Sequence, residues 1–333
     1  MTNSEIIKKI FLLFNDDKNE EFIEVAKEYI DREKRKNHTL VARELEKALF
    51  QKVNISPSQK RFKQEVPIPR DGEKGFPLLE IQHFDNYFED LILSSETKSQ
   101  LERVVNEFKD SDILATYNLS YKKKVLLCGA PGTGKTFSVQ TISSLLQIPL
   151  VYIRFDAIVS SYLGETAGNL RKVFDFIENG TWIVLFDEVD IIGKNRDDSH
   201  EHGEIKRVVN NFLQMLDNFK GKSILFAATN HQNMLDSAIW RRFDEVIDYR
   251  LPTQDTRVKL FDRYLRCLKR SKDIDLKSVA KASKGLSPSD IEMIATEAMK
   301  TAIIDSRNEL SVIDLDDAIK KFQKREKVKH KKL

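Results

Sequence analysis

The stretch VLLCGAPGTGKT, at residues 125–136, decides how the rest of the chain is interpreted. Its apolar start predicts a buried strand, and residues 137–146 predict a helix directly after it. Between the two stands the pattern G-x-x-x-x-G-K-T, in which glycines let backbone N–H groups turn toward a phosphate. The positive end of the helix dipole points at the same place. A phosphate-binding loop therefore explains this stretch better than a strand-to-helix turn with a chance lysine.

Every residue of this loop is a candidate for nucleotide binding. Lys135 is expected to reach the β- and γ-phosphates, and the hydroxyl of Thr136 is expected to hold Mg²⁺. The candidate nucleotide-binding residues of the loop are Gly129, Ala130, Pro131, Gly132, Thr133, Gly134, Lys135 and Thr136.

Further apolar runs predict a parallel sheet that carries the loop. Helical segments separate these runs, which lie at residues 150–153, 182–186, 223–228 and 246–249. Strands that are apolar throughout and alternate with helices form parallel sheets covered on both faces. With the strand before the loop, this predicts a five-stranded α/β sheet whose chemistry lies at the carboxyl ends of the strands.

Three polar residues follow two of these strands. Asp187 and Glu188 close the run at 182–186, and Asn230 follows the next run. The first carboxylate can hold Mg²⁺, usually through water, and the second can orient or deprotonate an attacking water. Asn230 could position the same water, although alone it would be interpreted as a strand-end cap. A lone Asp-Glu pair is weak evidence, but beside a phosphate loop it indicates a hydrolytic site.

Composition sets limits on partners and location. The 333 residues include 55 Lys and Arg against 52 Asp and Glu, so a net charge of +3 does not favour nucleic acid as the main partner. Cys128 and Cys267 are both interpreted as buried hydrophobes in a reducing compartment. The chain shows no signal-peptide pattern and no apolar run of membrane-spanning length. We therefore expect a cytoplasmic protein without a membrane partner.

The chain divides into four parts by pattern. Residues 1–52 carry three short apolar stripes of a small helical domain, which is either a stabilising appendage or a recognition module for a substrate or separate protein partner. Residues 53–83 hold four of the eight prolines and are interpreted as a linker. Residues 84–250 form the α/β domain. After Pro252 the strands stop, so residues 251–333 are predicted to form an all-helical domain ending in a basic tail.

The run of motifs resembles the AAA clade of AAA+ ATPases, the group that holds spastin, katanin and the membrane-bound AAA proteases. The loop is similar to the family's GPPGTGKT, with Ala130 in place of the first proline. IVLFDEVD at 183–190 resembles the Walker B strand, AATN at 227–230 resembles sensor 1, and LDSAIWRRFD at 235–244 resembles the second region of homology. The resemblance covers residues 84–322 and implies a P-loop AAA+ module with a helical lid.

The resemblance also implies roles for residues outside the phosphate loop. Arg241 and Arg242 would be arginine fingers that reach the nucleotide of the adjacent subunit; without the family they would be a solvated helix end. The segment at 160–176 resembles the first pore-loop segment, with an aromatic–hydrophobic–glycine triplet that grips an extended polypeptide; the alternative is an aromatic that covers the sheet edge. That triplet is Tyr162, Leu163 and Gly164.

Two departures from the family pattern concern the base and the lid. Leu91 and Ile92 stand where relatives line the adenine pocket, but Leu93 replaces the glycine of that motif. In the lid, Pro288 replaces a glycine that would approach the nucleotide, although proline also suits the first turn of a helix.

Together these features predict a Mg²⁺-dependent ATPase that remodels, unfolds or threads polypeptides through a homo-oligomeric ring, by resemblance a hexamer. No protease motif is present in the chain. Two alternatives stay open: a nucleic-acid-directed ATPase, which the basic linker and the tail at 320–333 favour mildly, and an ATP-dependent switch or adaptor that threads nothing.

Overall fold

A computed structural model of the chain describes residues 9, 13, 25–32, 67–72, 75–153, 158, 166–190, 202–231 and 237–330. The chain separates into two compact units, residues 1–67 and 68–333. In the first unit, residues 25–32 are helical, and Leu13, Ala26 and Ile30 are buried. Most of the predicted helical domain at 1–52, and its third stripe entirely, lies outside the described residues.

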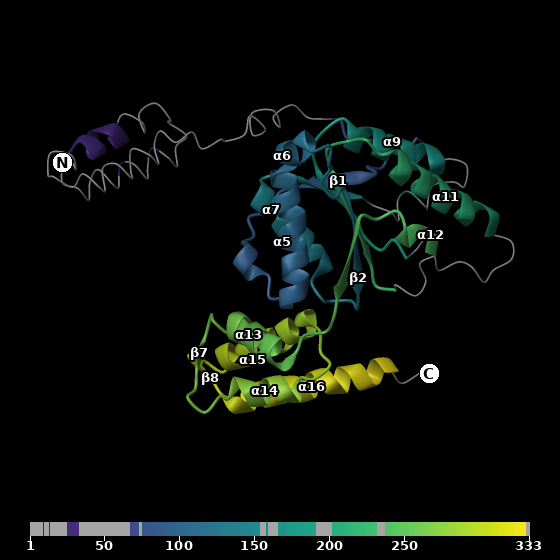
Figure 1. Ribbon diagram of the computed structural model, residues 1–333. Coiled ribbons are helices and arrows are strands. Elements are labelled where there is room, and N and C mark those ends of the chain that lie inside the picture. The colour runs from purple at the N-terminus through teal and green to yellow at the C-terminus, as the bar shows by residue number, and fades with distance from the viewer. Residues whose placement is uncertain are drawn as a thin grey trace. The chain divides into compact units, whose positions relative to one another are not determined.

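The second unit contains a six-stranded sheet with the strand order β1-β3-β4-β5-β2-β6 (Figure 1). The five predicted strands are present and pair in parallel. A sixth strand, β1, pairs antiparallel with β3 at one edge, and it lies inside the range 53–83 that the sequence predicted as a linker. The strands are β1 (Leu79–Gln82), β2 (Lys124–Gly129), β3 (Leu150–Ile153), β4 (Ile183–Phe186), β5 (Ile224–Thr229) and β6 (Glu245–Tyr249).

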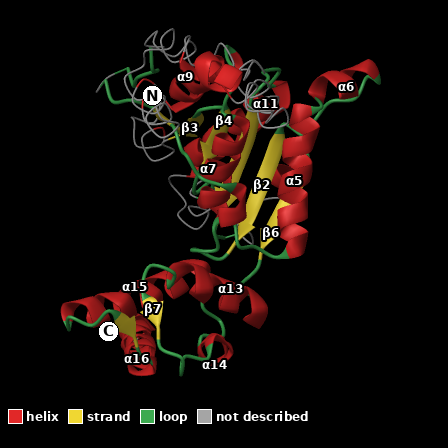
Figure 2. Ribbon diagram, turned by 90° about the vertical axis from the view of Figure 1, so that its left-hand side faces the viewer, coloured by secondary structure: helices red, strands yellow, loops and turns green. Residues whose placement is uncertain are grey.

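Helices cover both faces of this sheet (Figure 2). On one face, α5 and α7 bury Val104 and Ile142 against strand residues such as Leu127 and Leu185. On the other face, α9 and α11 place Phe174 and Phe212 around Phe186 of β4, with ring centroids 5.8 Å and 5.2 Å from it. The α/β domain contains α5 (Ser95–Lys109), α6 (Ser111–Thr116), α7 (Lys135–Leu146), α9 (Thr166–Glu178), α11 (His202–Asn218) and α12 (Ser237–Trp240).

The remainder of the second unit is a helical domain with its own core, which includes Phe261, Ile291 and Leu315. The prediction that strands stop after Pro252 was wrong, because two short strands of two residues each pair in parallel between the helices. The elements are α13 (Gln254–Tyr264), β7 (Lys269–Arg270), α14 (Leu276–Ala282), α15 (Pro288–Ile304), β8 (Glu309–Leu310) and α16 (Val312–His330).

The two cysteines differ in their surroundings. Cys128 is buried in β2, as predicted, and burial raises the pKa of its thiol to about 12. The prediction for Cys267 was wrong, because this residue is exposed in the turn that follows α13. None of the described helices is both long enough and apolar enough to cross a bilayer.

Candidate active site

The predicted phosphate loop connects β2 to α7 and depends on glycine at three positions. Gly129, Gly132 and Gly134 have φ angles of 144°, 73° and 100°, which residues with a Cβ rarely adopt. A Cβ on Gly129 would lie 2.3 Å from the carbonyl oxygen of Tyr249 on the neighbouring strand. The loop therefore keeps its shape because no side chain stands between it and the sheet.

Lys135 is the first residue of α7, and its side chain lies over the loop. Its Nζ donates hydrogen bonds to the carbonyl oxygens of Gly129 at 2.8 Å and Ala130 at 3.0 Å, and to Oδ1 of Asn230 at 2.8 Å. The residue is buried, and burial lowers the pKa of its ammonium group, while Asp187 acts in the opposite direction. A buried cation held at the start of a helix is suited to binding an anion.

A carboxylate and a hydroxyl meet where β4 ends beside α7. The hydroxyl of Thr136 donates to Oδ2 of Asp187 at 3.0 Å. The other oxygen of Asp187 accepts the backbone N–H of Glu188 at 2.9 Å. Hydroxyl and carboxylate oxygens are ligands that Mg²⁺ prefers, so this pair fits the ion that the sequence predicts.

Glu188 is exposed at the end of β4 in an unusual backbone conformation, with φ at 54°. Residues other than glycine adopt this left-handed region at a cost of about 1 kcal/mol or more. Glu188 is one of the residues that line the cleft beside the phosphate loop. The structure thus brings Lys135, Thr136, Asp187, Glu188 and Asn230 to one end of the sheet, as the sequence predicted.

These residues line a cleft of about 490 Å³ between the α/β domain and the helical domain. Leu91, Ile92 and Leu93 line it on the α/β side, directly after the short 3-10 helix η1 (Phe88–Asp90). On the helical side it is lined by residues of α13 and α15 that the sequence did not single out, namely Leu260, Arg263, Tyr264, Ser289 and Glu292. The cleft is roomy enough for a nucleotide and offers an apolar wall for its base.

Pro288 stands in the first turn of α15, as the sequence predicted, and the start of this helix touches the phosphate loop. Ser287 caps the helix in a reciprocal arrangement with Asp290. The backbone N–H of Ser289 donates to the carbonyl oxygen of Gly132 at 3.1 Å. The helical domain therefore contacts the loop through backbone atoms. The pattern Ser-Pro-Ser-Asp indicates the start of a helix but not this contact with the loop.

The two predicted arginine fingers lie after α12, and neither belongs to the described lining of the cleft. Arg241 is exposed and forms no ion pair with the described residues. Arg242 donates to Oδ2 of Asp217 at 2.9 Å and to the carbonyl oxygen of Ala238 at 2.7 Å. Among the described residues, Arg241 therefore has no ion-pair partner, whereas Arg242 is held by contacts within the same chain.

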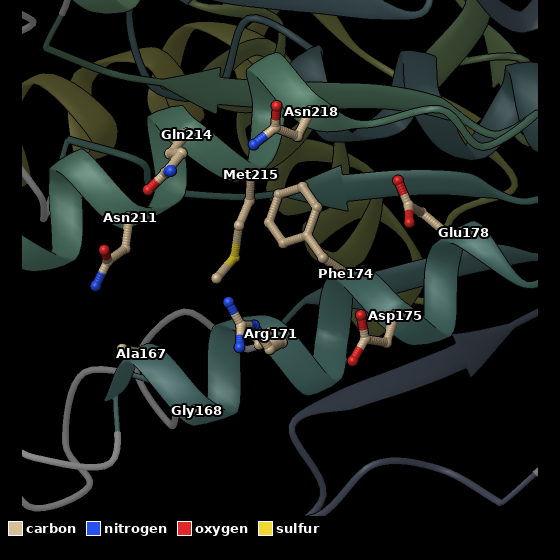
Figure 3. A pocket seen from close by; sticks show the side chains of 10 residues that line it. All are labelled: Ala167, Gly168, Arg171, Phe174, Asp175, Glu178, Asn211, Gln214, Met215 and Asn218. Atoms are coloured by element: carbon tan, nitrogen blue, oxygen red, sulfur yellow. The ribbon is translucent and has the colours of Figure 1, made fainter.

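The remaining predicted residues lie outside the described part of the chain. Tyr162, Leu163 and Gly164 fall between residue 158 and the start of α9. A second hollow of about 410 Å³ lies between α9 and α11 (Figure 3). Arg171 and Met215 point toward each other across it. None of the residues predicted for the ATPase site lines this hollow.

Comparison with known proteins places these features in a family context. The model of the AAA family, described as ATPase family associated with various cellular activities, matches residues 125–251. The chain is 35% identical over 324 residues to the uncharacterized AAA family ATPase y4kL of Sinorhizobium fredii, covering 96% of this chain and 95% of that protein.

Two further relatives match only in part. A proteasome-activating nucleotidase of Archaeoglobus fulgidus is 34% identical over 221 residues, which are 64% of this chain and 56% of that protein. The ATP-dependent zinc metalloprotease FtsH 2 of Petrotoga mobilis is 31% identical over 241 residues, which are 70% of this chain and 38% of that protein. The similarity to these two relatives therefore leaves about half or more of their length unmatched.

Proposed function

The chain belongs to the AAA family of ATPases, and from that premise we propose that it couples ATP hydrolysis to the remodelling of polypeptides. The proposed remodelling is unfolding or threading through a homo-oligomeric ring, for which we propose six subunits. One observation carries the catalytic part: Lys135, Thr136, Asp187, Glu188 and Asn230 converge at one end of the sheet beside a cleft. The relatives named as a nucleotidase that activates the proteasome and as an ATP-dependent protease support the polypeptide substrate.

Each residue of the cluster has a distinct proposed role. The loop N–H groups and Lys135 hold the phosphates, and Thr136 and Asp187 hold Mg²⁺, which neutralises charge on the phosphoryl group when bound. Glu188 accepts a proton from the attacking water, since it is exposed and lines the cleft, and none of the described residues forms an ion pair with it. Asn230, whose Oδ1 accepts a hydrogen bond from Lys135, orients that water from the neighbouring strand.

The base and the neighbouring subunit complete the proposed site. Leu91 and Ile92 provide the apolar wall against which the adenine packs. Arg241 is the better-suited arginine finger, because an exposed guanidinium without an ion-pair partner among the described residues is available to an adjacent subunit. Arg242 is paired with Asp217, and we propose that it stiffens the segment that carries Arg241 and reaches the neighbour only if that pair opens.

The substrate-facing part of the proposal rests on sequence. Tyr162, Leu163 and Gly164 grip the polypeptide from the segment that precedes α9 in the sequence, and residues 1–52 recognise a substrate or separate partner. We place this activity in the cytoplasm, following the resemblance to AAA+ remodelling enzymes.

The test is an ATP-dependent capture experiment with the full chain. Glu188→Gln, which retains ATP without hydrolysing it, is incubated with an extract of the source cell, and the material released by removing nucleotide is identified. We expect specific polypeptides, and we expect their capture to disappear when Tyr162→Ala is added. Tyr117→Ala is the matched control, because Tyr117 is a surface tyrosine with 74% exposure at the end of α6. Elution of nucleic acid, or capture that persists without Tyr162, would contradict threading of protein.

A further inference from the structure

Two hydrogen bonds between described residues that line the cleft join the α/β domain to the helical domain, and Ile92 also packs against the core of the helical domain. In the first, the backbone N–H of Ser289 donates to the carbonyl oxygen of Gly132. In the second, Nη1 of Arg263 donates to Oδ1 of Asp90 at 2.5 Å. The first contact is between backbone atoms at the phosphate loop. The second is an ion pair between side chains, so substitutions can remove it without removing the first contact.

The Asp90–Arg263 pair connects segments 173 residues apart in the sequence. Asp90 ends η1 and directly precedes Leu91 and Ile92, the proposed adenine wall. Arg263 lies in the last turn of α13, next to Tyr264, which also lines the cleft. The two side chains are 25% and 22% exposed, so solvent screens the pair only partly. The hydrogen bond from Arg263 also holds the pKa of the Asp90 carboxyl below its ordinary value.

The pair stands at the boundary of the cleft. Asp90, Ile92 and Arg263 line the cleft itself. Ile92 and Arg263 also line a separate hollow of about 480 Å³ on the outer side, together with charged residues of α13 such as Lys259 and Asp262. Since the same two residues face both spaces, they form the wall that separates the base end of the cleft from the outside.

We propose that Asp90 and Arg263 form an ion-pair clasp that holds the helical domain over the base end of the nucleotide cleft and limits the rate of nucleotide release. This inference rests on the proposed ATP site. Release through the base end requires the α13 wall to move away from Leu91 and Ile92, and that movement breaks the charge-assisted hydrogen bond. The clasp affects the rate of nucleotide dissociation and not the rate of hydrolysis, because neither Asp90 nor Arg263 belongs to the cluster around Lys135.

The experiment measures dissociation of fluorescent ADP from the full chain after mixing with excess unlabelled ADP. Asp90→Ala and Arg263→Ala are each expected to release ADP about tenfold faster than the wild type, because a partly exposed charge-assisted hydrogen bond is lost. The double variant is expected to release ADP at the same rate as either single variant, because both substitutions remove the same interaction. Asp90→Asn, which keeps the shape of the side chain, is expected to show a smaller increase.

Arg103→Ala is the matched control, because Arg103 forms an ion pair of the same kind with Glu107, at 3.0 Å, within α5. We expect it to release ADP at the wild-type rate. If the wild-type chain binds ADP but the clasp variants release it at the wild-type rate, or if the effects of the two alanines multiply, the clasp is refuted. If the wild-type chain gives no binding signal at all, the proposed nucleotide site is refuted instead.

Discussion

The contact between the phosphate loop and α15 leads to a quantitative prediction for Gly132→Ala. A Cβ at this position would lie 2.8 Å from Oγ of Ser287 and 2.9 Å from Cβ of Ser289, where 3.4 Å is the start of ordinary contact. The helical domain must then withdraw by about 0.5 Å, which stretches the 3.1 Å bond from Ser289 to Gly132 beyond hydrogen-bonding distance. Losing that bond and forcing alanine to a φ of 73° cost about 1 kcal/mol each.

The strain at this φ is present with and without nucleotide and lowers only stability. The lost bond, about 1 kcal/mol, corresponds to an about fivefold weaker affinity for nucleotide, because binding requires the closed arrangement of loop and helix. Fluorescence titration with labelled ADP measures it. Gly285→Ala is the control, because Gly285 has a similar φ of 86° but its Cβ would meet nothing within 4 Å. The control is expected to lose stability but to bind nucleotide normally. Equal affinities for the wild type and Gly132→Ala would refute the reasoning.

Three further predictions follow from individual contacts. Lys135→Ala is expected to weaken ATP binding by at least about a hundredfold in a titration, since it removes the buried cation of the loop; wild-type affinity would contradict its role. Gly129→Ala is expected to lower the free energy of unfolding by about 3 kcal/mol in urea denaturation, because its Cβ would overlap the carbonyl of Tyr249; a loss below about 1 kcal/mol would contradict the overlap. Arg307 holds the pKa of Asp314 well below its ordinary 3.8. That carboxylate therefore stabilises the fold fully above the unfolded pKa and loses its effect as the pH falls below it. Asp314→Asn is expected to be less stable than the wild type by about 1 kcal/mol at neutral pH, with a difference that narrows toward about pH 3; a constant difference would contradict the linkage.

The central strands, and the position of the candidate site residues at their ends, could be predicted because the local sequence pattern is sufficient for them. A fully apolar run such as Ile183–Phe186 has few places to lie other than inside a parallel sheet, and the polar residues that follow it then fall at one sheet end. The phosphate loop carries its own conformational requirement in the glycines. In these parts of the chain, residues that are close together in the sequence are enough to predict which side chains are buried and where the chain turns.

The parts that could not be predicted depend on distant partners. Strand β1 has one buried residue in four and lies among prolines, so only its pairing with β3, some seventy residues later, identifies it. Strands β7 and β8 contain two residues each, and each is a strand only because it pairs with the other. The Asp90–Arg263 pair joins positions 173 residues apart, and no periodicity in either segment indicates it.

The prediction that Cys267 is buried was wrong because the helix before it ends earlier than the sequence indicates. The sequence predicts helices throughout this part of the chain, but α13 ends at Tyr264, where the backbone N–H of Leu265 donates to the carbonyl oxygens of Phe261 and Arg263. Cys267 then falls in a turn and is exposed, while Leu265 is buried in the helical domain.

The most direct test of the central claim measures ATP binding and ATP turnover on the same sample of purified Glu188→Gln. Glu188 lines the cleft beside Asp187 but forms no part of the phosphate loop, so its amide variant keeps the binding surface intact. We expect wild-type affinity for ATP and a turnover reduced by at least about a hundredfold, since the proton acceptor is lost. Turnover at the wild-type rate would contradict the assignment of Glu188 and, with it, the proposed mechanism.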